Sequence, residues 1–176
     1  MTEFGAATKP SKLVPVLIGG GAMTVISITP YLNFINCACC AGIMGAAVLG
    51  VWFYKKSFPM DMPFSIGDGA AIGALSGVVG AFFTTILQFL MLSGGSVDLT
   101  TQLENAFDEA EMQATDPAAV EAARELIMQI AAQPMMLFLI GLLFALVLYV
   151  GFGALGGLIG GNIFKTKVLP QTPVEN

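Results

Sequence analysis

Residues 135–164 read MMLFLIGLLFALVLYVGFGALGGLIGGNIF and contain no charged side chain. Three further apolar runs occupy residues 13–32, 37–54 and 64–92. A helix of about 20 apolar residues is about 30 Å long, which matches the thickness of a bilayer core. The sequence therefore predicts an all-α protein built as a bundle of four transmembrane helices.

The composition of the whole chain agrees with this prediction. Of 176 residues, 56% are hydrophobic and 11% are charged, and the mean hydropathy is +0.81. Soluble domains average roughly 45–50% apolar and 25% charged residues. Histidine, the commonest general base and metal ligand, is absent, and no basic patch points to nucleic acid. We expect no enzymatic activity, no cofactor and no nucleic-acid partner.

Residues 93–134, between the third and fourth apolar runs, form an acidic segment. From Asp98 to Gln133 there are eight acidic residues and one basic residue, Arg124. Apolar residues recur there at helical spacing. Thr115-Asp116-Pro117 suits the start of a second helix, because Thr or Asp can cap a helix and Pro fits its first position. We expect a short helical hairpin.

The basic residues indicate how the chain crosses the membrane. With four crossings, six of the seven lie on one face, and only Arg124 lies on the other. The six are Lys9, Lys12, Lys55, Lys56, Lys165 and Lys167. Lys and Arg favour the cytoplasmic side, so we expect cytoplasmic tails at residues 1–12 and 165–176 and the acidic hairpin outside. A cleaved signal peptide is disfavoured, since no small-residue cleavage site follows the first run.

Small residues recur every fourth position in three of the runs. Such small-xxx-small stripes let helix backbones approach closely in membranes. The stripes are Gly69, Gly73 and Gly77 in the third run, Gly153, Gly157 and Gly161 in the fourth, and Ala38, Gly42, Ala46 and Gly50 in the second. We expect the third and fourth helices to touch backbone to backbone, although the same stripes could serve a homodimer.

The cysteines form one cluster, Cys37, Cys39 and Cys40, at the outer end of the second run. Thiolates bind soft metals such as Cu(I) or Zn(II), and Cys37 and Cys40 would share a helical face. A closed zinc site needs four ligands, and free cysteine packs as a small hydrophobe. Packing is therefore the favoured interpretation, and no metal site is predicted.

Few polar groups lie within the apolar runs. Asp68 is the only carboxylate, and we expect it at the cytoplasmic interface beside Lys55 and Lys56. The remaining polar candidates are Thr84, Thr85, Gln88 and Tyr149. Hydrogen bonding between helices is their expected role, whereas a transport path would require them to align with Asp68 on one face.

Three segments resemble a group of uncharacterised bacterial four-helix membrane proteins. They are Asn36-Cys37-Ala38-Cys39-Cys40, Ile66-Gly67-Asp68-Gly69-Ala70 and Gly156-Gly157-Leu158-Ile159-Gly160-Gly161. The resemblance covers most of the apolar portion but not the acidic hairpin. It implies a multi-pass protein of the bacterial inner membrane and supplies no activity.

Three hypotheses for function follow. The first is a structural or accessory subunit that packs with the lipid bilayer and with itself or a membrane complex. The alternative is a small oligomeric transporter or channel component, because four helices enclose little space. The third is a membrane enzyme acting on lipid or thiols through the cysteine cluster.

Overall fold

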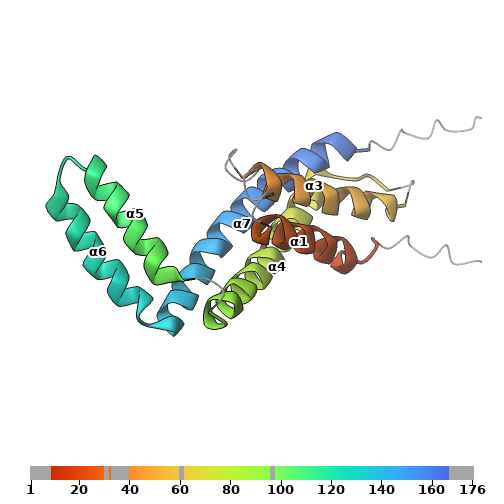
Figure 1. The fold of residues 1–176 in the computed structure, drawn as a ribbon. Helices are drawn as coiled ribbons and strands as arrows, with labels where there is room; N and C mark the ends of the chain where they lie inside the picture. Colours follow the sequence, from red (N-terminus) through yellow and green to blue (C-terminus); the bar gives the residue numbers. More distant parts are fainter. Residues whose placement is uncertain (1–8, 30–31, 33–39, 60–61, 96–97, 167–176) are drawn as a thin grey trace, which may run out of the picture. The chain divides into compact units, whose positions relative to one another are not determined.

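The computed structural model describes residues 9–29, 32, 40–59, 62–95 and 98–166, and this part of the chain forms six α-helices and no strand (Figure 1). The all-α prediction is confirmed for these residues. The helices are α1 (Leu13–Ile28), α3 (Ala41–Lys56), α4 (Ile66–Ser93), α5 (Leu99–Gln113), α6 (Pro117–Ala131) and α7 (Pro134–Phe164). An isolated antiparallel bridge joins Phe64 to Thr166.

Two helices among the described residues, not the four expected, are long and apolar enough to cross a membrane: α4 with 28 residues and α7 with 31. Length and composition alone give weak support for a membrane location, because the core helix of a soluble protein passes the same test. The first and second runs form helices of only 16 residues, α1 and α3.

Local backbone geometry explains why α1 and α3 are shorter than expected. Thr29 is extended (φ −77°, ψ 116°), as a residue before a proline prefers, so α1 ends at Ile28 instead of reaching residue 32. Cys40 has a left-handed backbone (φ 57°), which a right-handed helix cannot include, so α3 begins at Ala41 instead of residue 37.

The chain divides into two compact units. The bundle unit covers Met1–Thr84 and Leu146–Asn176 and contains α1, α3 and parts of α4 and α7. The hairpin unit covers Thr85–Ala145 and contains α5, α6 and the remaining parts of α4 and α7.

In the bundle unit, α1 packs along α3 (Figure 1). Tyr54, at the end of α3, stacks edge-on against Phe58 at a centroid distance of 5.5 Å, and Phe58 does so against Phe64 at 5.3 Å. All three side chains are buried, as are Val51 and Ile72 in the same core cluster. Aromatic pairs in this geometry stabilise beyond the area they bury.

In the hairpin unit, α5 and α6 pack against each other (Figure 1). The side chain of Asp98 caps α5 by accepting a hydrogen bond from the Thr101 amide at 3.2 Å. Asp116 caps α6 through the Ala118 amide at 3.1 Å, with Pro117 as the first helical residue. Both caps satisfy amides that have no partner inside the helix.

Candidate functional site

The glycines of α4 and α7 lie against one another inside the bundle unit. A Cβ added to Gly73 would lie 2.8 Å from the Gly157 Cα and closer still to the Gly153 carbonyl oxygen. A Cβ on Gly69 would lie 2.7 Å from the Gly161 Cα. The obstacle in each case is backbone, which cannot rotate away as a side chain can. The two helices therefore meet backbone to backbone along this seam.

The sixth glycine of the predicted set, Gly77, meets the backbone of Tyr149 and Val150. In the reverse direction, a Cβ on Gly153 would lie 3.4 Å from the Gly77 Cα, and one on Gly157 would lie 3.0 Å from the Gly73 Cα. The structure thus brings all six predicted packing glycines together. We call this contact the α4–α7 seam.

Further glycines make contacts between the other helices of the bundle unit, and one of them, Gly50, belongs to the stripe expected in the second run. Gly20 of α1 abuts α4, where an added Cβ would lie 3.0 Å from the Ser76 carbonyl oxygen. Gly50 of α3 abuts α1 at the Pro15 carbonyl oxygen, also 3.0 Å away. Gly156 of α7 abuts the Met44 backbone of α3. The run of three glycines at residues 19–21 was the available signal for the α1 contact.

Asp68 lies at the start of α4 and is almost fully buried, with 7% of its side chain exposed. Its carboxylate accepts hydrogen bonds from Lys9 Nζ at 2.9 and 3.0 Å, and Lys12 Nζ lies 3.7 Å away. The sequence placed Asp68 beside Lys55 and Lys56, but its ion-pair partners are Lys9 and Lys12, because these two lysines directly precede α1 and lie at the start of α4. The hydrogen bond raises the pKa of Lys9 above its ordinary 10.5.

Asp68 also forms a capping box with Ser65. The Ser65 hydroxyl accepts from the Asp68 amide at 3.1 Å, and the Asp68 carboxylate accepts from the Ser65 amide at 3.4 Å and its hydroxyl at 2.8 Å. This reciprocal pair satisfies two amides at the helix start. The spacing Ser-x-x-Asp before an apolar run was its sequence signal. Asp68 therefore fixes the start of α4 and ties it to the segment before α1.

Lys55 and Lys56 make different contacts at the same end of the bundle unit. Lys55 Nζ donates to the Thr166 hydroxyl at 3.1 Å and lies 5.4 Å from the centre of the Phe64 ring. Lys56 Nζ lies 3.7 Å from the centre of the Trp52 ring, a cation–π contact. We call the five described lysines here the basic end: Lys9, Lys12, Lys55, Lys56 and Lys165.

A second polar cluster joins three helices of the bundle unit. The Tyr149 hydroxyl of α7 donates to the Ser27 hydroxyl of α1 at 2.5 Å and lies 3.4 Å from the Thr84 hydroxyl of α4. Tyr149 and Thr84 are both buried. The cluster matches the expected role of these residues, hydrogen bonding between helices.

The other predicted polar residues lie in different surroundings. Thr85 is buried but belongs to the hairpin unit, and Gln88 of that unit is exposed. Asp68 lies at the basic end, with its carboxylate already engaged by Lys9 and Ser65. Within the bundle unit, Asp68 therefore belongs to a different polar cluster from Tyr149 and Thr84.

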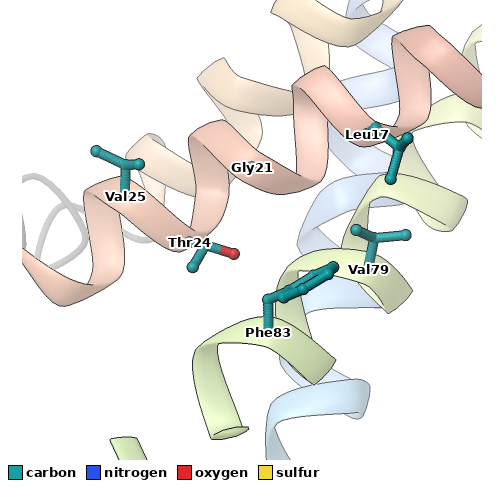
Figure 2. A pocket seen from close by; sticks show the side chains of 6 residues that line it. All are labelled: Leu17, Gly21, Thr24, Val25, Val79 and Phe83. Atoms are coloured by element: carbon teal, nitrogen blue, oxygen red, sulfur yellow. The ribbon is translucent and has the colours of Figure 1, made fainter. Parts of the chain in front are cut away.

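An apolar groove runs between α1 and α4 in the bundle unit (Figure 2). It has a volume of about 370 Å³ and is lined by Leu17, Gly21, Thr24, Val25, Val79 and Phe83. Its one hydroxyl, that of Thr24, already donates to the Gly20 carbonyl oxygen at 3.0 Å. The groove is therefore lined by no ionisable side chain, and its one hydroxyl proton is already donated within α1.

Of the three clustered cysteines, only Cys40 is among the described residues. Cys37 and Cys39 lie outside the described residues. Cys40 is the residue before α3 and has a left-handed backbone, so it lies outside that helix. The face that it was expected to share with Cys37 lies outside the described residues. Among the described residues, no three Cys, Asp or Glu side chains are grouped so that they could hold a metal ion.

Comparisons with known proteins add no relative, because no protein-family model, curated protein or solved structure matches the chain.

Proposed function

We propose that this chain is an integral protein of the bacterial inner membrane and acts as a structural or accessory subunit without catalytic chemistry of its own. In this proposal the bundle unit lies in the bilayer, and the α4–α7 seam holds its two longest helices together. The observation that carries the proposal is the contrast between the two faces of α7, one tightly packed and one apolar and open.

The open face of α7 supports a lipid environment. In the bundle unit, α7 buries Gly153, Gly157 and Gly161 but exposes large apolar side chains between them, whereas the core helix of a soluble protein is mostly buried. Exposed apolar patches of this extent are rare on soluble monomers. The large exposed side chains of this part of α7 are Val147, Leu155, Leu158, Ile159 and Ile163.

The seam suits lipid as well. Between apolar helices in lipid there is no hydrophobic driving force, so association depends on close van der Waals contact. Glycine provides this contact, as Gly73 and Gly157 do across the seam. In water, each glycine inside a helix destabilises that helix by about 0.5–1 kcal/mol relative to alanine.

The thickness of the bundle unit is compatible with four crossings. The parts of α4 and α7 inside it, residues 66–84 and 146–164, would each be about 29 Å long. α1 and α3 would be about 24 Å long, slightly short of a bilayer core of about 30 Å. Local thinning and lysines that extend towards the headgroups accommodate such a mismatch at modest cost.

The basic end supports the orientation. Five lysines gather where α1 and α4 begin and where α3 and α7 end. Because lysine is enriched on the cytoplasmic side of membrane proteins, the basic end supports an orientation with residues 9–12 and 165–166 inside the cell. By chain order, the acidic hairpin of α5 and α6 then lies outside, as a contact surface for a partner.

The second candidate is a small oligomeric transporter or channel component. It is favoured by buried hydroxyls in the bundle unit, above all that of Ser76, which is fully buried and has no hydrogen-bond partner among the described residues. An unsatisfied buried hydroxyl is a common position for an internal water. A transport path would need further copies of the chain to enclose it.

Native mass determination of the protein, taken from its own membrane without detergent, separates these candidates. A defined assembly with a different protein supports the accessory-subunit proposal and identifies the process. An assembly of this chain alone favours the transporter or channel candidate. Recovery of the protein as a monomer free of lipid would contradict both.

A further inference from the structure

The outward face of α3 ends in a cation beside an aromatic ring. Gly45, Leu49, Trp52 and Lys56 follow one another at spacings of four, three and four residues, so they share one helical face. All four are exposed, and nothing in the structure lies within 4 Å of where a Cβ on Gly45 would be. This face, which we call the α3 stripe, is therefore covered by no other part of the described chain.

The order of side chains along the α3 stripe follows the order of groups in a phospholipid. Gly45 and Leu49 are apolar, Trp52 is an amphipathic ring of the type enriched at membrane interfaces, and Lys56 is a cation. Lys56 Nζ lies 3.7 Å from the centre of the Trp52 ring, so a single ligand can contact both the positive charge and the aromatic ring.

The charge of Lys56 is available to a ligand. Lys9, by contrast, forms an ion pair with Asp68, in which Nζ lies 2.9 Å from a carboxylate oxygen. Lys56 makes no ion pair with any described residue and is exposed. Among the described residues of the bundle unit, Asp68 is the only acidic side chain against five lysines. The basic end therefore carries an excess of positive charge.

We propose that the α3 stripe binds an anionic phospholipid, with its phosphate on Lys56, its interfacial region against Trp52 and an acyl chain along Leu49 and Gly45. This inference rests on the proposed membrane location. The phosphate is the charge that lysine recognises, and the apolar part of the stripe distinguishes a lipid from a free anion. A juxtamembrane lysine contributes about 1 kcal/mol to attraction by anionic lipid, which corresponds to about a fivefold preference.

Trp52 is the only tryptophan of the chain, so its fluorescence reports on this site alone. The protein is reconstituted in phosphatidylcholine vesicles that contain equal mole fractions of brominated phosphatidylglycerol or brominated phosphatidylcholine. Bromine quenches tryptophan on contact. Each variant is compared with itself in unbrominated lipid, because removing Lys56 also changes the emission of Trp52.

We expect brominated phosphatidylglycerol to quench Trp52 more strongly than brominated phosphatidylcholine. Lys56→Gln should remove this excess, with about a fivefold fall in relative affinity, whereas Lys9→Gln, which makes the same charge change, should keep most of it. An equal fall in both variants would overturn the assignment, because it would indicate diffuse surface charge. Competition by soluble glycerol phosphate would overturn the assignment to a lipid.

The same data separate this inference from the proposed function. Equal quenching by both brominated lipids contradicts the phospholipid site and leaves the membrane location intact. No quenching by either lipid contradicts the membrane location itself.

Discussion

Replacing a glycine in the α4–α7 seam by alanine tests the packing with the smallest possible change. At Gly157 the added Cβ would lie 3.0 Å from the Gly73 Cα and closer still to the Gly69 carbonyl oxygen. Because both obstacles are backbone, the helices have to move apart along the seam. The matched control is Gly151→Ala in the same helix, where nothing lies within 4 Å of the new Cβ.

The magnitude follows from two effects of opposite sign. Alanine stabilises a helix by about 0.5–1 kcal/mol relative to glycine, and both variants gain this. Overpacking costs about 1–3 kcal/mol, and only Gly157→Ala incurs it. The two variants should therefore differ in unfolding free energy by about 1–3 kcal/mol. This corresponds to about 2–12 °C in Tm for a chain of this size.

Thermal unfolding in one detergent, followed by circular dichroism, measures this difference. We expect Gly157→Ala to unfold well below Gly151→Ala, and Gly157→Leu to unfold lower still because its side chain is larger. Gly73→Ala, on the opposite side of the seam, should behave like Gly157→Ala. Equal melting temperatures for Gly157→Ala and Gly151→Ala would refute the packing argument.

Three further predictions concern single polar contacts. Tyr149→Phe removes the hydroxyl that donates to Ser27 and should lower the unfolding free energy by about 0.5–1.5 kcal/mol in denaturant titrations; an unchanged midpoint would contradict it. The pKa of Lys9 is raised by Asp68, so the stability that this pair contributes is complete below about pH 10.5 and is lost as pH rises through the higher folded-state pKa. Lys9→Gln should therefore flatten the alkaline part of the stability profile, and a profile of unchanged shape would count against the pair. Asp116→Ala removes the cap of α6 and should destabilise that helix by about 1 kcal/mol, seen as faster amide exchange at its first turn only; unchanged exchange there would show that the cap is dispensable.

Residue spacing was enough to suggest the α4–α7 seam. Gly77 and Gly153 lie at similar distances from the inner ends of their runs, so antiparallel helices bring their glycines to the same depth. The start of α6 at Pro117 could also be predicted, because the sequence Thr-Asp-Pro contains both a capping side chain and a proline suited to the first helical position. Both features depend on short stretches of sequence.

Other features depend on tertiary structure or on single backbone angles. Lys9 and Asp68 are 59 residues apart, and their pairing requires α1 to pack beside α4, which residue spacing does not reveal. The left-handed backbone at Cys40 occurs in a residue that rarely adopts it, so no local pattern indicated the later start of α3. Hydropathy reports burial in apolar surroundings but not the residue at which a helix begins.

The placement of the chain in the membrane is tested most directly by thiol labelling in intact cells. In a variant that lacks Cys37, Cys39 and Cys40, a cysteine is introduced either at Ala114, between α5 and α6, or at Lys165, after α7. We expect a membrane-impermeant maleimide to label Ala114→Cys in intact cells and Lys165→Cys only after the cells are permeabilised. Labelling of Lys165→Cys in intact cells, or labelling of neither site until permeabilisation, would contradict the proposed crossing of the bilayer.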